Sequence, residues 1–142
     1  MKIFVRIVVI ILLLFNGTGA LYGGISLVSD PTGSGLHLPL SFLEHTPFRN
    51  YMIPGIVLLC VNGLFSFVTL FTILFKYRKS SLFVIAQGIL LGGWIIVQII
   101  LVRVFYPPLH VTFLLTGAAF LACGFYMYHI GITPEKISQG SE

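Results

Sequence analysis

The sequence carries very little charge. Of its 142 residues, 8% are Asp, Glu, Lys or Arg, whereas soluble domains carry about 25%. Hydrophobic residues make up 57%, and the mean hydropathy is +1.03. Because this number of charged residues cannot cover the surface of a water-soluble globule, the sequence predicts an integral membrane protein. Since one membrane span takes roughly 20 apolar residues, the length allows about four spans and no separate soluble domain.

Cysteine is also scarce. Cys60 and Cys123 both lie inside apolar runs, and no CxxC or Cys/His ligand spacing occurs. Redox chemistry, a metal site and a cofactor therefore have no support in the sequence. The net charge of +4 comes from basic residues at the ends of apolar runs, not from one patch, which argues against a nucleic-acid partner.

Asp, Glu, Lys and Arg are absent from the middle of every apolar run. Proton-coupled pumps and small multidrug exporters need a carboxylate inside the membrane, so both classes are excluded. No HExxH or GxSxG motif is present either. No catalytic residue is predicted from motifs, and an enzyme is the less favoured interpretation.

Four apolar runs are present. They predict an all-α membrane protein: four antiparallel transmembrane helices in a single domain over residues 1–142, with spans at about 7–28, 51–75, 82–102 and 109–130. Pro107 and Pro108 are expected to form a short turn before the last span. Residues 2–20 also fit a signal peptide, but apolar character continues past Ala20, so a retained first helix is favoured.

The basic residues predict an orientation. With the N-terminus inside, the inner side holds six and the outer side two: Lys2, Arg6, Lys76, Arg78, Lys79 and Lys136 against Arg49 and Arg103. This asymmetry favours both termini in the cytoplasm, with residues 29–50 facing outward.

The segment 29–50 is expected to be an ordered outer loop that packs over the mouth of the bundle. Asp30-Pro31-Thr32-Gly33 fits a type I turn, in which Asp30 should accept backbone N–H bonds. Ser41 and Glu44 have the spacing of a capping box, which predicts a short helix from Phe42 to His45. Five large apolar side chains between Leu36 and Leu43 argue against a solvated linker.

Each span carries small or polar residues at helical spacing, which should face the interior. Five of these residues are candidates for a polar layer or the floor of a ligand cavity: Asn16, Asn62, Trp94, Gln98 and Thr116. The alternative is simple contact between helices. Gly88 and Gly92 form a GxxxG motif that suits either the internal bundle or a homodimer.

The remaining titratable residues lie mainly in the outer loop. Turn formation and capping account for most of them, with a metal or catalytic site as the alternative, although their spacing matches no known ligand pattern. If the loop covers a ligand, three residues are expected at the rim: Asp30, Arg49 and His110.

One stretch of sequence has a recognisable pattern. It consists of Gly23-Gly24, Leu27, Asp30-Pro31, Gly33, Leu36, Pro39-Leu40, Leu43, Thr46-Pro47-Phe48, Tyr51 and Ile53-Pro54-Gly55, with Gly93-Trp94 and Gln98 in the third span. This pattern resembles an uncharacterised family of small bacterial four-span integral membrane proteins. The resemblance implies the cytoplasmic (inner) membrane of a bacterium and a retained first helix, and it carries no activity.

Three classes of function stay open. The leading one is a non-enzymatic structural or accessory subunit of a membrane assembly, with other membrane subunits or a second copy as partners. The second is a binder or carrier of lipid-like molecules in a cavity under the outer loop. The third is an enzyme acting at the outer surface. Membrane lipid is a partner in each.

Overall fold

The computed structural model describes residues 2–130. Residues 2–130 form helices and turns, with no strand. Four helices are long and apolar enough to cross a membrane: Lys2–Ser29 (α1), Met52–Leu74, Ser80–Val102 (α4) and Pro107–His129 (α5). The predicted all-α fold with four spans is therefore confirmed. The C-terminal tail, including Lys136, lies outside the described residues.

The second span changes its winding in the middle. It begins as an α-helix (α2, Met52–Val57), continues as a π-helix (η3, Leu58–Leu64) and ends as an α-helix (α3, Phe65–Leu74). The π-helical segment holds the buried Asn62 and Gly63. π-helical turns are rare and often occur at functional sites. The regular spacing of small residues in this span did not indicate it.

The turn between α4 and α5 is shorter than expected. α4 ends at Val102, and Arg103 follows it in a left-handed conformation (φ 58°). Pro107 and Pro108 are the first two residues of α5 rather than a separate turn. Proline is tolerated there because the first N–H groups of a helix have no intrahelical partner.

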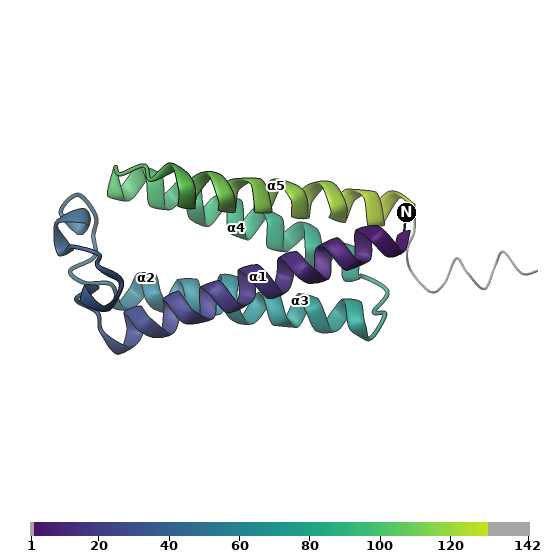
Figure 1. Cartoon of the computed structure of the whole chain (residues 1–142), viewed down its shortest axis with the longest axis horizontal. Coiled ribbons are helices and arrows are strands. Elements are labelled where there is room, and N and C mark those ends of the chain that lie inside the picture. The colour runs from purple at the N-terminus through teal and green to yellow at the C-terminus, as the bar shows by residue number, and fades with distance from the viewer. Residues whose placement is uncertain (1, 131–142) are drawn as a thin grey trace, which may run out of the picture.

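The four spans form two pairs. α1 packs along the whole second span, and α4 packs along α5. Figure 1 shows that the pairs meet near the N-terminus and diverge toward the connection between α1 and α2. At the closed end, the guanidinium of Arg6 donates to the Ile73 carbonyl at 2.9 Å, which satisfies a carbonyl in the last turn of α3.

Glycines allow the close approach within each pair. A Cβ at Gly24 would lie 2.9 Å from the backbone nitrogen of Leu59, and one at Gly88 would lie 2.9 Å from the Gly117 carbonyl oxygen. Gly88 of the GxxxG motif is therefore used between α4 and α5, inside the chain. Such contacts replace the hydrophobic drive that helices lack in lipid.

The connection between α1 and α2 (residues 30–51, the α1–α2 loop) folds back on the bundle. It contains two short 3₁₀ helices, Ser34–Leu36 (η1) and Leu40–Leu43 (η2). Leu43 and Tyr51 are buried against Leu27 of α1. The Tyr51 hydroxyl donates to the Pro39 carbonyl at 2.8 Å, and its N–H donates to the Pro31 carbonyl at 2.9 Å. The side chain of Tyr51 thus ties the loop to the start of the second span.

The expected capping box does not form. Ser41 lies inside η2, and its carbonyl, not its hydroxyl, accepts the N–H of Glu44 at 3.2 Å. The short helix spans Leu40–Leu43 instead of the predicted Phe42–His45, so it begins two residues earlier, after Pro39, which has no side-chain acceptor.

Asp30 organises the first turn of the loop. Its carboxylate accepts the Thr32 N–H at 3.2 Å and the Gly35 N–H at 3.3 Å, together with the hydroxyls of Thr32 and Ser34. Its carbonyl accepts the Gly33 N–H at 3.1 Å. The predicted turn and the predicted bond to Thr32 are therefore both present.

These bonds make the turn sensitive to acid. Donation from the Ser34 and Thr32 hydroxyls lowers the pKa of Asp30 from 3.8 to about 2. Because the folded pKa is the lower one, the ionised carboxylate stabilises the turn above pH 3.8, and this contribution is lost as pH falls toward 2. We expect the NMR signals of the Thr32 and Gly35 amides to titrate with a midpoint of about 2. The titration should vanish in Asp30→Asn, and a midpoint near 3.8 would contradict these bonds.

Candidate functional site

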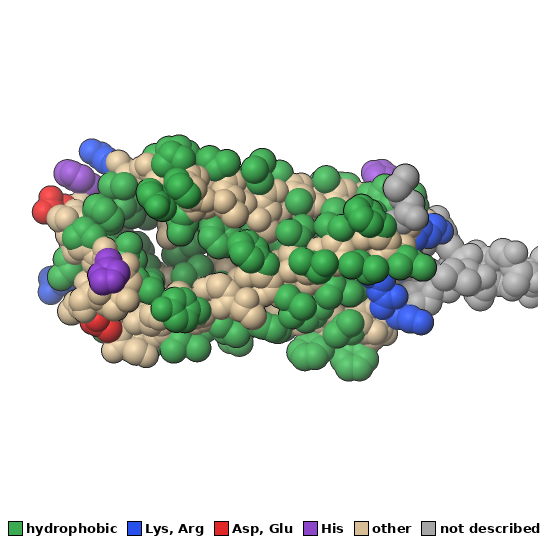
Figure 2. Space-filling view, in the orientation of Figure 1, with side chains coloured by type: hydrophobic (Ala, Val, Ile, Leu, Met, Phe, Trp, Pro, Cys, Tyr) green, Lys and Arg blue, Asp and Glu red, His purple; other side chains and the backbone are tan. Residues whose placement is uncertain are grey.

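A cavity of about 500 Å³ lies between the two helix pairs, where they diverge. Sites for small molecules usually occupy about 300–1,000 Å³. One wall comes from the second half of α1, including Asn16, Gly19, Tyr22 and Gly23. Figure 2 shows the hollow between the loop and the helices, so the cavity opens on the long side of the bundle.

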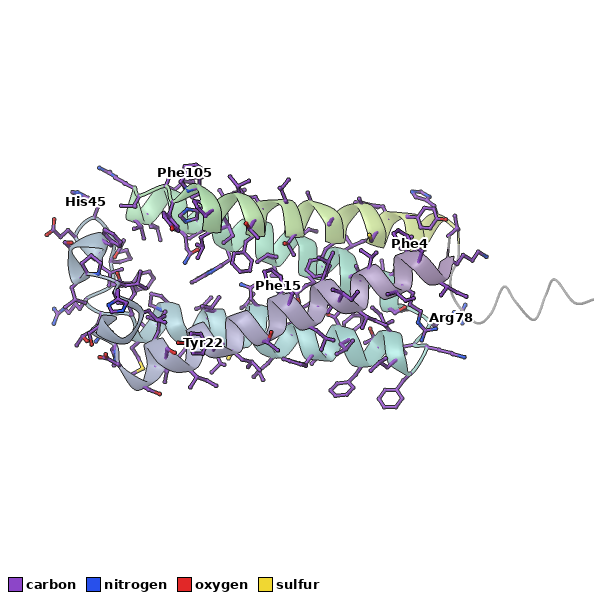
Figure 3. All side chains as sticks on the ribbon, in the orientation of Figure 1. Phe4, Phe15, Tyr22, His45, Arg78 and Phe105 are labelled. Atoms are coloured by element: carbon purple, nitrogen blue, oxygen red, sulfur yellow. The ribbon has the colours of Figure 1, made fainter. Side chains whose placement is uncertain are left out.

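The opposite wall comes from the end of α4 and the start of α5. Trp94 and Gln98 contribute from α4, Tyr106 from the residue before α5, and His110 from the first turn of α5. Tyr22 and Phe105 are labelled in Figure 3 on opposite sides of this space. The cavity therefore exists because the pairs separate at this end.

The α1–α2 loop forms the roof. Leu36, Leu38 and Phe42 line the cavity from the loop, and Tyr51 lines it from the loop's end. Leu43 is buried against the helices, and Leu36 and Leu38 both pack on its cluster and line the cavity. Leu40 is exposed and does not line the cavity.

The lining is almost entirely apolar. It contains no Asp, Glu, Lys or Arg, and its polar side chains come from Asn, Gln, His, Tyr and Trp. An apolar pocket with a few placed polar groups is typical of a small-molecule site. This lining suits an uncharged, largely apolar molecule.

His110 is the most constrained polar group in the wall. It is 7% exposed, and its ring stacks on Phe105 with centroids 5.4 Å apart. Its Nδ1 accepts the backbone N–H of Tyr106 at 2.8 Å. The same Nδ1 also lies 3.1 Å from the Tyr106 carbonyl oxygen. Because the closer N–H can only donate, we infer that Nδ1 is the acceptor and that Nε2 carries the ring proton. His110 therefore presents a hydrogen-bond donor.

A buried polar cluster lies at the floor of the cavity. The side-chain nitrogen of Asn16 donates to the Ser66 hydroxyl at 2.9 Å and to the Asn62 carbonyl at 3.4 Å. Gln87 donates to the side-chain oxygen of Asn62 at 3.4 Å. Asn16 belongs to both the cluster and the cavity lining, so the cluster joins three spans directly beneath the cavity.

Within residues 2–130, three buried side-chain polar atoms of the second span and α4 have no hydrogen-bond partner. They are the side-chain nitrogen of Asn62, the side-chain oxygen of Gln87 and the hydroxyl of Thr69. Such groups are rare in interiors and mark a place where polarity is kept despite its cost. The π-helical segment holds Asn62 in this position.

The five residues of the predicted polar layer separate into three groups. Asn16 and Asn62 meet in the floor cluster, where Ser66 and Gln87 join them. Trp94 and Gln98 instead lie in the cavity wall. Thr116 is buried and donates to the Thr112 carbonyl of its own helix at 2.8 Å.

The three predicted rim residues are also divided. His110 lines the cavity, whereas Asp30 and Arg49 are not among the lining residues. Asp30 is engaged by the turn, and Arg49 is exposed on the loop. Within residues 2–130, no three His, Cys, Asp or Glu side chains gather where they could share a metal ion.

Sequence reasoning missed the roles of Tyr106 and Gln87. Gln87 shares a helical stripe with Trp94 and Gln98, which was the available signal. Tyr106 acts through its backbone N–H, for which residue type gives no signal.

We expect the floor cluster to couple α1 to the second span weakly. Interhelical hydrogen bonds in membranes are worth about 0.6 kcal/mol on average and about 1.7 at most. A double-mutant cycle of Asn16→Ala and Ser66→Ala, followed by SDS-induced unfolding in micelles, should give a coupling energy in this range. A coupling energy of zero would show that the two side chains do not bond.

Comparison with known proteins yields no relative. No protein-family model, no curated protein and no solved structure matches the chain. The resemblance to the bacterial four-span family therefore stays a prediction, and the case for function depends on the cavity.

Proposed function

We propose that this protein binds or carries lipid-like molecules in the cavity under the α1–α2 loop. The main support is the cavity of about 500 Å³, whose apolar lining contains no Asp, Glu, Lys or Arg. It opens on the long side of the bundle, which faces acyl chains when the four helices span a bilayer. A ligand can therefore enter from the membrane without crossing water.

The structural or accessory role is the second candidate, and the packing gives it less support. That role calls for small residues exposed for another subunit. Five span glycines, Gly24, Gly55, Gly88, Gly117 and Gly124, instead face neighbouring helices of the same chain. The open ones are Gly19, which lines the cavity, and the adjacent Gly92 and Gly93. The enzymatic alternative needs the loop carboxylates and histidines to converge. Glu44 and His45 are exposed, while Asp30 is engaged by its own turn.

Trp94 offers a direct test of binding because it is the chain's only tryptophan and lines the cavity. We would titrate dibromostearoylglycerol into nanodiscs of unbrominated phosphatidylcholine that hold the full chain. Bromine quenches indole fluorescence on contact, so a bound ligand should give saturable quenching.

Two matched variants distinguish the cavity from the lipid-facing surface. A Cβ at Gly19 or at Gly93 would meet nothing within 4 Å, but only Gly19 lines the cavity. Gly19→Phe should occupy the cavity and remove saturable quenching, whereas Gly93→Phe should retain it. Equal quenching in both variants would contradict the proposed function.

We also propose the inner membrane of a bacterium, with both termini in the cytoplasm. Among residues 2–130, more Lys and Arg side chains lie at the end that holds the N-terminus than at the loop end, where Arg49 and Arg103 lie (Figure 2). This asymmetry is the basis of the orientation.

Cysteine labelling in intact cells tests this orientation. With Cys60 and Cys123 replaced, an impermeant maleimide should label Ser41→Cys in the loop but not Lys79→Cys between α3 and α4. Both parent residues are exposed. Labelling of Lys79→Cys alone would reverse the topology.

A further inference from the structure

We propose that the cavity selects a neutral lipid whose polar end carries a carbonyl or hydroxyl oxygen, held by His110 and Gln98 near the loop. The inference rests on the proposed function and adds the chemistry of the head group. It follows from three features of the lining: its lack of charge, the fixed donor of His110, and a neighbouring amide that has no partner.

The lack of charge excludes ionised head groups. No Asp, Glu, Lys or Arg lines the cavity. An ionised phosphate or carboxylate drawn inside would lose its water and gain no opposite charge, which is strongly unfavourable. A hydroxyl or carbonyl oxygen needs only a hydrogen bond to be accommodated.

His110 supplies such a bond. Its Nδ1 is engaged by the Tyr106 N–H, which leaves Nε2–H as the free donor of a ring that is 7% exposed and lines the cavity. Nε2 has no hydrogen-bond partner among residues 2–130. A donor that faces an apolar cavity gains a hydrogen bond when a ligand oxygen lies against it.

The His110 ring is also fixed in place. Stacking on Phe105 and the bond to Tyr106 hold it from two sides. A ligand oxygen therefore meets a donor that is already oriented, which reduces the entropy lost on binding.

Gln98 and Trp94 extend the polar region on α4. Both line the cavity, and their side chains have no hydrogen-bond partner among the described residues. The Gln98 amide can donate and accept, so it can pair with a hydroxyl or a carbonyl, while the Trp94 N–H can only donate. Apart from Asn16 at the floor and three tyrosines, the remaining lining is apolar and suits the chain of the lipid.

The selectivity test uses the Trp94 quenching assay with two probes that share one acyl chain. Dibromostearoylglycerol has a neutral head, and dibromostearoyl lysophosphatidate carries a phosphate. We expect the neutral probe to bind at least about tenfold more tightly, because burial of the unpaired phosphate is unfavourable.

Two variants test the donor. His110→Asn keeps an amide oxygen at the position of Nδ1, so it can still accept the Tyr106 N–H, but it lacks Nε2–H. We expect it to weaken binding of the neutral probe by about fivefold to tenfold, the value of one hydrogen bond. Gln98→Leu should have a similar effect, and since it leaves α5 untouched it guards against misfolding of the His110 variant.

The outcomes separate the two proposals. Equal affinity for both probes, with quenching that Gly19→Phe removes, would overturn the selectivity and leave the proposed function standing. Unchanged affinity in both His110→Asn and Gln98→Leu would do the same. The absence of any quenching sensitive to Gly19→Phe would overturn both.

Neutral lipids with such oxygens come from two sources, acylglycerols and isoprenoid quinones. Competition between dibromostearoylglycerol and a decyl-tailed benzoquinone distinguishes them. Displacement by the quinone at equal concentration assigns the site to carbonyl-bearing rings, and its failure to displace assigns it to acylglycerols.

Discussion

Replacing Gly88 by leucine is expected to lower the free energy of unfolding by about 1–3 kcal/mol, the usual effect of overpacking. A Cβ at this position would lie 2.9 Å from the Gly117 carbonyl oxygen and 3.0 Å from the Leu121 backbone nitrogen. Both atoms belong to the α5 backbone, which cannot move aside like a side chain. α4 and α5 must therefore separate along their contact.

Gly93→Leu is the matched control on the same helix. Its Cβ would meet nothing within 4 Å, so only the higher helix propensity of leucine should act, a gain of up to about 0.8 kcal/mol. SDS-induced unfolding in mixed micelles, followed by Trp94 fluorescence, measures both variants. If Gly88→Leu and Gly93→Leu have the same free energy of unfolding, or if Gly88→Leu changes only self-association, the prediction is contradicted. The GxxxG motif would then serve a contact between two copies of the chain.

The sequence was sufficient for the number and position of the spans. Long apolar runs bounded by charge or proline have few alternatives, because a backbone in lipid must satisfy its own hydrogen bonds. Helical spacing also selected buried residues in the second span, since Gly55, Asn62, Ser66 and Thr69 are all buried. Spacing shows which face of each helix is buried, but it does not show which other helix packs against that face.

The separation of the two helix pairs was therefore not predictable. Whether two helices touch or diverge depends on small tilts that arise from contacts such as Gly24 against Leu59. The cavity follows from these tilts, and so does the division of the predicted polar layer into a floor cluster and a wall. A layer drawn from depth alone places Asn62 and Trp94 together, because depth ignores the lateral distance between helices.

The loop shows the same limit at shorter range. The turn at Asp30 was predictable because its bonds span only a few residues. The anchoring of the loop by Tyr51 was not, since its hydroxyl reaches back twelve residues to the Pro39 carbonyl. Residue types in the loop indicated burial, and only the folded chain shows which side chains face the cavity.

Replacing Gly33 by alanine is expected to release the α1–α2 loop from the bundle. Gly33 has φ 76°, a left-handed conformation that costs a non-glycine residue about 1–3 kcal/mol. A Cβ there would also lie 2.6 Å from the Leu38 carbonyl oxygen and 2.8 Å from the Tyr51 ring. Strain and collision act together at the point where the loop turns back.

Hydrogen exchange of the Leu36–Leu43 amides measures this release. We expect protection to fall by about 30-fold, which corresponds to about 2 kcal/mol of local opening. Gly35→Ala is the matched control, because its Cβ would meet only the Asp30 carboxylate at 3.9 Å. Unchanged protection in Gly33→Ala would show that the loop does not depend on this turn.

Release of the loop should also change the cavity. Leu36 and Leu38 form part of its roof, and Trp94 stands in its wall. When the roof leaves, the indole gains contact with water, so its emission should shift to longer wavelength and acrylamide should quench it more strongly. Binding of dibromostearoylglycerol should weaken in the same variant, because the apolar contacts of the roof are lost. Loss of loop protection without any change at Trp94 would show that the loop does not cover the cavity.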